Sequence, residues 1–427
     1  MDINRNLIDF ISKCPTAFHT ALTVSRILED EGFELYFPGR PVDLGGRYYL
    51  VRNSSSVFAF TIPREIPVSA VIGAAHGDSP SFKLKNNFVL KRGGGLLCLN
   101  TEKYGGMELK SWFDTPLGVA GRLAYNDGDK VKTVLCDSES PVCIIPNTAV
   151  HLQRDREADL RNDLFALFAS EDGGDSLAKL LCEKAGIKAD QILGADLFLY
   201  NCARGLVWGP KGEFISAPRL DDLQCVYTCL KGFLDSGESP CLKLLAVFDN
   251  EEVGSSTKQG ADSDVLETLV RSVLDSLGAD RAAADRIISA SFAVSADNAH
   301  AVHPNRPELN DPMDRPVLNG GVVVKSNANQ RYTTDAVSGA VLKKTAQKAG
   351  VPIQYYSNRS DLPGGSTLGN IMIRHLSVDC VDIGAPQLAM HSVFETAGAR
   401  DTESLYQLMK TVFSSEIAAA QDGFTVR

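Results

Sequence analysis

Four short apolar runs along the chain each end in residues that can bind a metal ion. The runs cover residues 69–75, 244–248, 288–294 and 378–384. Apolar runs of this length between polar residues predict buried strands. The side chains that follow them, in chain order, are His76 and Asp78, then Glu251 and Glu252, then Asp297 and His300, and, after a short loop, His391. Because ligands gather beyond the carboxyl ends of strands in open α/β sheets, these residues predict a metal site at one sheet edge.

The rest of the pattern predicts an α/β domain that contains a second, mostly β domain. Helical periodicity at 223–233, 265–277, 335–349 and 402–420 alternates with the apolar runs, which is typical of a doubly wound fold. Between about residues 85 and 205 the pattern of hydrophobic and polar residues changes. Short alternating or β-branched runs occur at 88–91, 131–135 and 142–145, and a turn signal occurs at 126–129. We therefore expect a catalytic domain of residues 1–86 and 206–427, with residues 87–205 inserted into it.

Composition narrows the class of protein. A chain of 427 residues is longer than single cores usually grow, which favours two domains. The net charge of −10 argues against a nucleic-acid-binding surface. No segment is long and apolar enough to span a membrane, and the N-terminus lacks the apolar core of a signal peptide. The ten scattered cysteines form no Cys-x-x-Cys pair and are interpreted as reduced thiols, so we expect a cytoplasmic protein.

Glu251 and Glu252 are the most informative residue pair. Alone, such a pair is more often a solvated acidic loop. At a strand end, however, adjacent side chains point in different directions, so one Glu can bind a metal while the other faces an attacking water. Asp221 precedes the predicted helix 223–233, where a helix N-cap and a metal ligand are equally good interpretations. Its neighbour Asp222 can serve as the cap and leave Asp221 for metal.

The segments that carry these residues resemble the aspartyl aminopeptidase family, the M18 branch of the di-zinc aminopeptidases. The resemblance rests on residues 76–80, 218–221, 249–254, 295–305 and 389–392, which occur in the family's order. It extends from about residue 8 to the last predicted helix. The chain departs from the family at Gly77, where Thr is usual, and at Asp222, where Asn is common. The resemblance implies a doubly wound, mixed-sheet zinc exopeptidase domain with an inserted, mostly β domain used for oligomerisation.

The resemblance also implies a two-metal site. Zn²⁺ is the expected metal, and Co²⁺ or Mn²⁺ are alternatives. The implied roles are Asp221 as the ligand shared by both ions, His76 and Asp297 on one ion, Glu252 and His391 on the other, Glu251 as general base, and Asp78 as the partner that orients His76. This agrees with the chemistry of zinc, which accepts mixed His and carboxylate ligands.

Further residues are implied to shape the substrate site. The expected substrates are peptides with an acidic N-terminal residue, and the expected assembly is a tetrahedral homo-dodecamer. His151 would reach into the active site of a neighbouring subunit, and Asp361 with residues 364–367 would help to form the pocket floor. His300 and His303 are expected to line the pocket. From the residues alone, Lys325 is a solvated or salt-bridged lysine; the resemblance makes it the candidate partner of the substrate's acidic side chain, with Arg331 as the rival.

Together these features predict a metalloaminopeptidase. One alternative is another di-zinc exopeptidase or a deacylase with the same ligands. A second alternative is a metal-stabilised assembly without catalysis. The presence of both Glu251 and Glu252 favours an enzyme over such an assembly, because a scaffold needs no general base.

Overall fold

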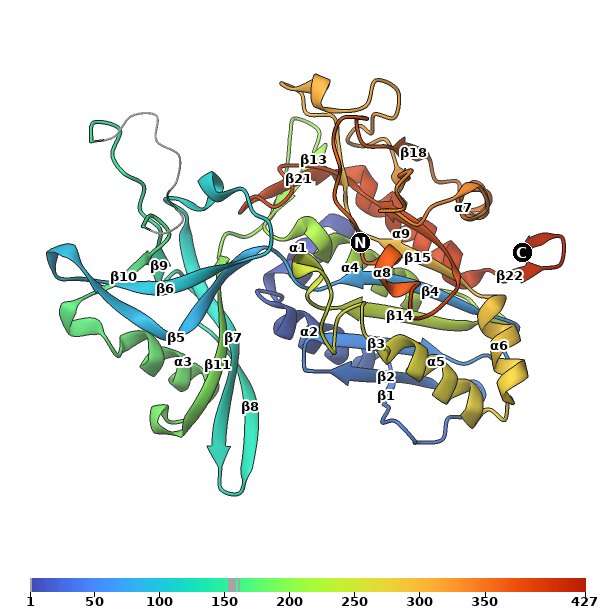
Figure 1. Ribbon diagram of the computed structural model, residues 1–427, viewed down its shortest axis with the longest axis horizontal. Helices are drawn as coiled ribbons and strands as arrows, with labels where there is room; N and C mark the ends of the chain where they lie inside the picture. The colour runs from blue at the N-terminus through green and yellow to red at the C-terminus, as the bar shows by residue number, and fades with distance from the viewer. Residues whose placement is uncertain (1, 153–158, 160–161) are drawn as a thin grey trace.

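A nine-stranded mixed sheet forms the centre of the larger of two lobes (Figure 1). The computed structural model describes residues 2–152, 159 and 162–427. In spatial order the strands are β1 (Glu34–Leu35), β2 (Arg47–Arg52), β3 (Ser56–Thr61), β14 (Leu242–Phe248), β4 (Ala70–His76), β15 (Phe292–Ala296), β19 (Asp379–Gly384), β17 (Val322–Lys325) and β18 (Ile353–Tyr356). The four central strands, from β14 to β19, are parallel to one another.

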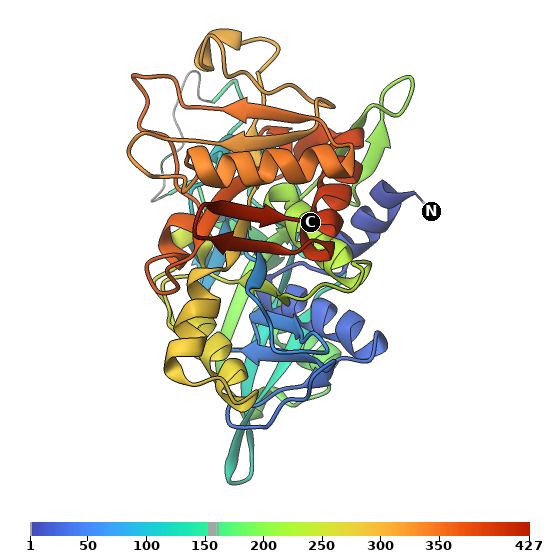
Figure 2. The same ribbon diagram turned by 90° about the vertical axis from the view of Figure 1, so that its right-hand side faces the viewer.

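Helices cover both faces of this sheet, which confirms the predicted doubly wound α/β fold (Figure 2). One face packs against α1 (Ile3–Ser12), α2 (Ala17–Asp30), α4 (Leu220–Leu234), α7 (Ala336–Ala349) and α9 (Ala399–Ser414). The other packs against α5 (Val265–Ser276), α6 (Arg281–Ser289) and α8 (Gly369–Met372). Along β4, Val71 and Ala75 enter the first core while Ile72 and Ala74 enter the second. This alternation explains why the strand is apolar throughout.

The smaller lobe contains a seven-stranded antiparallel sheet that closes on itself, because β11 pairs with both β5 and β7. Its strands are β5 (Ser81–Arg92), β6 (Leu96–Tyr104), β7 (Pro116–Asp127), β8 (Lys130–Asp137), β9 (Cys143–Ile144), β10 (Ala166–Ser170) and β11 (Ile192–Asn201). The predicted turn at 126–129 joins β7 to β8, and Gly128 adopts a φ of 67° there. This sheet and α3 (Ser176–Ala185) share a separate apolar core around Phe82, Leu99 and Trp112.

A third, five-stranded sheet lies at the catalytic edge of the large sheet. It comprises β12 (Leu206–Trp208), β13 (Phe214–Ala217), β21 (Glu395–Gly398), β20 (Pro386–Leu388) and β16 (Ala299–His300). Strands β16 and β20 continue the chain directly beyond β15 and β19. This sheet therefore holds the loops that follow two of the central strands. Among the described residues, no helix has the length and apolar character needed to cross a membrane.

Three local predictions are wrong. Residues 288 and 289 end α6 instead of starting a strand, because Ile288 packs on the helix side of the core. The last predicted helix stops at Ser414, and β22 (Ile417–Ala420) pairs with β23 (Gly423–Val426) instead. Asp222 does not cap α4 with its side chain; its carboxylate accepts a hydrogen bond from the His76 N–H at 3.2 Å. In each case a tertiary contact outweighs local propensity.

Candidate active site

The predicted ligands come together beyond the carboxyl ends of β4, β14 and β15. His76 is the last residue of β4 and pairs in register with Phe248 of β14. Asp297 follows β15 directly, and Glu252 lies in a 3₁₀ turn, η5 (Glu251–Val253), just after β14. Because the three strands are adjacent and parallel, their ends meet at one edge of the sheet. The first turn of α4 and the loop between β20 and β21 complete the group with Asp221 and His391.

Asp221 lies at the centre of this group, between two imidazoles. Its Oδ1 is 3.5 Å from the His76 Nε2, and its Oδ2 is 3.6 Å from the His391 Nε2. The His391 Nε2 is also 3.3 Å from the Glu252 Oε1. Asp297 joins His76 and Asp221 in a second overlapping group of potential ligands. The two carboxylate oxygens of Asp221 therefore face different sets of ligands.

Several oxygens in this group are buried without a hydrogen-bond partner. They are the Asp221 Oδ1, the Asp222 Oδ1 and the Glu252 Oε1. The Asp221 and Glu252 side chains are each only 3% exposed. Burying a carboxylate oxygen without a donor is costly unless a cation compensates for it. The orphaned oxygens, together with two imidazole nitrogens, are a donor set that fits zinc.

Asp78 contacts the residues of this group without being one of the predicted metal ligands. Its Oδ1 lies 3.3 Å from the His76 Nδ1, and its backbone carbonyl lies 3.1 Å from the same nitrogen. The Asp78 carboxylate also accepts the Glu251 and Glu252 N–H groups, each at 3.2 Å, and the Tyr104 hydroxyl at 2.7 Å. A carboxylate in this position fixes the ring orientation of a ligating histidine. Asp78 thus connects the end of β4 to the Glu251–Glu252 turn.

Glu395 has a similar supporting role that the sequence analysis missed. It is fully buried at the start of β21, and its carboxylate accepts the Asp221 N–H at 2.9 Å and the His391 N–H at 2.7 Å. Burial, with Asp221 nearby, raises the pKa of Glu395 well above its usual value. Its position four residues after His391 is the only signal in the sequence. Tyr104, from β6 of the other lobe, was also missed, because no motif in the sequence connects it to the metal ligands.

Glu251 lines the cavity in front of the metal-binding group, beside Glu252. Burial raises the pKa of Glu251 to about 8, and the nearby Asp297, Asp78 and Asp221 act in the same direction against the opposing effect of His76. A cation bound between these carboxylates lowers the pKa again. Glu251 is thus a carboxyl group that can change protonation state beside the site.

Lys325 ends β17 and lines the cavity, and its ammonium makes its contacts within the protein. Its side chain is 3% exposed, and its ammonium donates to the backbone carbonyls of Asp297 at 2.7 Å and Asn298 at 3.3 Å. The same nitrogen lies 3.6 Å from the Asp297 Oδ2. Although burial opposes its charge, Asp297 raises the pKa of Lys325 above the usual value. Lys325 lines the cavity, but its donors are engaged with the Asp297 segment rather than directed at a substrate.

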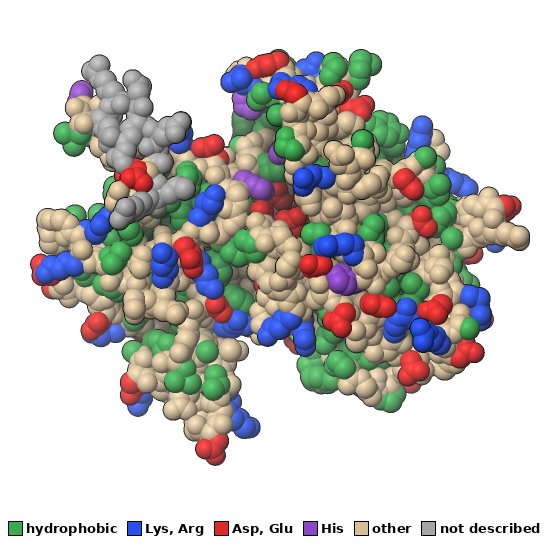
Figure 3. Space-filling model, viewed as in Figure 1, with side chains coloured by type: hydrophobic (Ala, Val, Ile, Leu, Met, Phe, Trp, Pro, Cys, Tyr) green, Lys and Arg blue, Asp and Glu red, His purple; other side chains and the backbone are tan. Residues whose placement is uncertain are grey.

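The cavity that contains the site has a volume of about 250 Å³. Figure 3 shows histidine and acidic side chains in the hollow between the two lobes. Its outer lining includes His300, Tyr332, Tyr356, Met390 and residues 365–367. His300 is partly exposed to solvent. Burial of its ring among protein atoms nevertheless lowers its pKa below the usual value.

Other predicted residues lie outside this lining. Asp361 is exposed and forms a bidentate ion pair with Arg359, at 2.6 and 2.9 Å, so it is not part of the pocket floor. His303 and Arg331 are exposed residues outside the lining. His151 is exposed in the loop between β9 and β10, next to residues that lie outside the described part of the chain.

Fold and site together define a class of protein. Histidine and carboxylate side chains beyond parallel strand ends, with an adjacent carboxyl group facing a cavity, are the arrangement of a metal-dependent hydrolase.

Comparison with known proteins gives the family. The model of the Aminopeptidase I zinc metalloprotease (M18) family matches residues 10–413. A probable M18 family aminopeptidase 2 of Clostridium novyi is 41% identical over 411 residues, which cover 92% of this chain and 94% of the relative. The chain belongs to the M18 family and is a metalloaminopeptidase.

Solved structures of similar proteins have the same fold as this chain. Ape4 in the cryo-EM structure of the Ape4 and Nbr1 complex has a TM-score of 0.93 at 31% identity, covering 97% of this chain and 85% of that one. The mApe1 dodecamer of S. cerevisiae has a TM-score of 0.85 at 26% identity, covering 96% of each chain.

Proposed function

We propose that this chain binds two divalent ions, most favourably zinc, and hydrolyses the N-terminal residue from peptides. His76 and Asp297 would hold one ion, Glu252 and His391 the other, and Asp221 both. The observation that carries this proposal is the position of Asp221 between two imidazoles, with one of its oxygens buried and unpartnered. Such a pair of ions, when bound, polarises the scissile carbonyl and makes water acidic near neutral pH.

The chain's own residues would then perform the proton transfers. Glu251 faces the cavity beside Glu252 and would take a proton from the attacking water and return it to the leaving amine. Asp78 would keep His76 in one orientation, because its carboxylate and its carbonyl both lie within 3.3 Å of the His76 Nδ1. Glu395 would fix the backbone of Asp221 and His391 by accepting hydrogen bonds from both of their N–H groups.

We propose that acidic N-terminal residues are preferred, and that His300 rather than Lys325 contacts the acidic side chain. Lys325 is the only Lys or Arg among the described lining residues, but its ammonium is bound to the Asp297 segment. Among the described residues the His300 ring forms no hydrogen bond, so it can offer an N–H to a carboxylate in the cavity. Arg331 is exposed outside the lining.

A substrate panel tests this function. Purified protein with zinc restored is assayed on aminoacyl and N-acyl derivatives of Asp, Glu and Leu. We expect cleavage of the aminoacyl substrates, with Glu and Asp faster than Leu, and no cleavage of the N-acyl ones. Faster N-acyl cleavage would instead identify a deacylase, and zinc-loaded protein without any turnover would identify a non-catalytic assembly. His300→Phe, which removes the N–H donor and keeps an aromatic ring, should reduce the Glu-to-Leu ratio of kcat/KM.

We also propose a homo-oligomer, a tetrahedral dodecamer, assembled through residues 87–205 in the cytoplasm. The S. cerevisiae relative is a dodecamer. The second sheet carries an open apolar groove that includes Leu96, Val142 and Phe168, and exposed apolar residues flank His151, with Leu152 82% exposed. Such a surface is typical of an interface. His151 would then act in a neighbouring subunit's site. All ten cysteines are free thiols, as a reducing compartment requires.

A further inference from the structure

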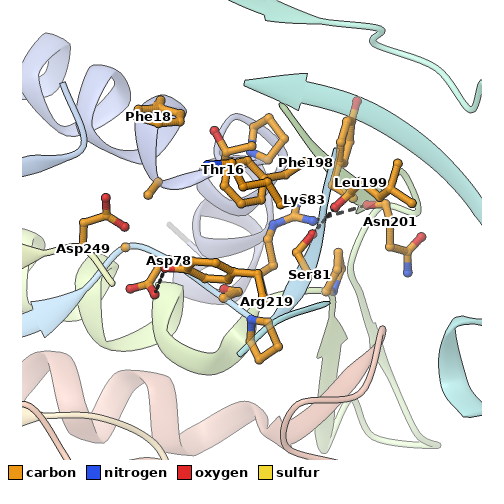
Figure 4. Close-up of a pocket in the computed structure, with 18 of the residues that line it drawn as sticks. Thr16, Phe18, Asp78, Ser81, Lys83, Phe198, Leu199, Asn201, Arg219 and Asp249 are labelled. Atoms are coloured by element: carbon orange, nitrogen blue, oxygen red, sulfur yellow. Dashed lines mark hydrogen bonds between the residues drawn. The ribbon is translucent and has the colours of Figure 1, made fainter. Parts of the chain in front are cut away.

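A second cavity, of about 240 Å³, is lined by residues of both lobes, among them Phe18, Lys83 and Arg219 (Figure 4). Its walls come from the start of α2, from β5 and β11 of the second sheet, and from the turn that precedes α4. Among the described residues the two cavities share one lining residue, Asp221, and the supporting residues Asp78, Tyr104 and Glu395 also line the second cavity. The second cavity is therefore a separate space that adjoins the metal-binding group.

Two cations of this cavity share one carboxylate. The Lys83 ammonium is 3.0 Å from the Asp196 Oδ1, and the Arg122 guanidinium is 2.7 Å from the Asp196 Oδ2. Although burial opposes it, these bonds keep the pKa of Asp196 below its usual value, so the carboxylate is ionised. The three groups together carry a net charge of +1, whereas Asp78, Asp221, Asp249 and Glu395 place carboxyl groups on other parts of the cavity wall.

Arg219 adds a further positive charge to the lining. Its guanidinium donates to the carbonyls of Cys14 at 3.1 Å and of Ile11 and Asn201 at 3.4 Å each. No ion pair of Arg219 is recorded within the described residues. The nearby Asp137 accepts the Tyr200 hydroxyl at 2.5 Å. The Arg219 guanidinium also lies 5.7 Å from the centre of the Tyr200 ring, so its partners are carbonyls and an aromatic ring, and it can take an anionic partner.

Aromatic rings surround the same end of the cavity. The Phe18 and Phe198 ring centroids are 6.5 Å apart, and the Lys83 ammonium lies 5.7 Å from the Phe198 ring centre. Trp112 and Pro15 extend the apolar wall. For comparison, a cavity of roughly 150 Å³ is enough to bind benzene. The space therefore accepts a ring that carries one acidic group.

The opposite end of the cavity touches the residues that support the metal ligands. Tyr104 lines it, and its hydroxyl donates to Asp78 at 2.7 Å. Asp78 in turn lies 3.3 Å from His76. Asp249 is also at this end, where burial and Asp78 raise its pKa to about 7. Anything that moves Tyr104 therefore acts on His76 through a single intervening carboxylate.

We propose that this cavity binds a small aromatic monoanion and that the bound anion modulates the active site through Tyr104 and Asp78. The acidic group would lie against Lys83, Arg122 and Arg219, and the ring against Phe18 and Phe198. The binding step needs only the charges and the shape of this cavity. The modulation of turnover additionally rests on the proposed function.

Calorimetry on the zinc-loaded protein tests the binding site with benzenesulfonate, an aromatic anion that is a weak metal ligand. Methyl phenyl sulfone is the neutral control of nearly the same shape. A parallel titration contains a saturating concentration of aspartate hydroxamate, a chelating compound that is added to occupy the metal site. Lys83→Gln removes one cavity cation and leaves Arg122 paired with Asp196. Lys91→Gln is the matched control, because Lys91 lies on the same strand but pairs with the exposed Glu171 outside the cavity.

We expect one benzenesulfonate per chain both with and without the hydroxamate, with an affinity that the hydroxamate shifts because the two sites are coupled, and no saturable binding of the sulfone. Lys83→Gln should weaken the affinity about tenfold, the size expected for one charge-assisted bond, whereas Lys91→Gln should leave it unchanged. Unfolding midpoints of both variants show that they are folded. Displacement by the hydroxamate, equal affinity in Lys83→Gln, or no saturable binding at millimolar concentrations would overturn the proposal. Binding is measured without turnover, so a failed peptidase assay would leave this result intact.

Discussion

Replacing Lys325 by Met separates two roles for this residue. If Lys325 holds Asp297, the substitution removes the donor to two carbonyls and the cation 3.6 Å from the Asp297 carboxylate. Breaking a buried pair by removing one partner costs about 3 to 5 kcal/mol, and ions bound at Asp297 reduce that cost. Loss of an outer partner of a metal ligand also lowers activity about 10- to 100-fold. Lys325→Met should therefore lower kcat/KM for N-terminal Glu and Leu alike.

The assay measures kcat/KM for Glu and Leu substrates, the unfolding midpoint and the zinc content. It compares three proteins, of which the first two are the wild type and Lys325→Met. The third is Arg331→Gln, a matched control that removes an exposed neighbouring cation outside the cavity lining. We expect the Glu-to-Leu ratio to stay constant in Lys325→Met while both rates and the unfolding midpoint fall. A selective loss of Glu cleavage, with Leu cleavage and stability preserved, would refute this reasoning and assign Lys325 to the substrate's acidic group.

Three further outcomes are expected. Glu251→Gln should retain its metals while kcat falls by about two to four orders of magnitude, the usual size of a general-base contribution; near-normal turnover would remove Glu251 from the mechanism. Mixing His151→Phe with Glu251→Gln under subunit exchange should partly restore activity, and no recovery despite proven exchange would count against action in a neighbouring subunit. Burial lowers the pKa of His19 to about 4 from 6.5, so the unfolded state binds the proton more readily. Stability should therefore fall by about 2 to 3 kcal/mol as pH drops from 6.5 to 4, as denaturant titrations would measure, and His19→Gln should remove that part of the dependence.

The sequence predicts the meeting of His76, Asp297 and Glu252 because each follows a short buried strand, and parallel strands end at a common edge. The supporting residues do not follow from that rule. Glu395 reaches Asp221 from a different sheet, and Tyr104 reaches Asp78 from the other lobe. Contacts of this kind depend on how lobes and sheets pack, which strand periodicity does not encode.

The orientation of a single side chain is equally hard to predict. Lys325 ends an apolar strand at the catalytic edge, as expected, but the strand's register points its ammonium at the Asp297 carbonyl. Asp361 pairs with the neighbouring Arg359 rather than turning into the cavity. At the C-terminus, residues 417–420 have helical propensity, yet they pair with residues 423–426 as a hairpin. In these places a specific partner in the folded structure decides the outcome, whether it is 28 residues away, as Asp297 is from Lys325, or close in sequence, and the sequence pattern does not rank such partners.

The central claim is that Asp221 is shared between two bound ions, and metal content per chain measures it most directly. Wild-type protein, Asp221→Ala, His76→Ala and His391→Ala are loaded with zinc, dialysed and analysed for metal and protein. We predict two ions per chain in the wild type, about one in each histidine variant, and loss of both in Asp221→Ala. Two tightly bound ions in Asp221→Ala would contradict the bridging role, and one ion in the wild type would contradict the two-metal site.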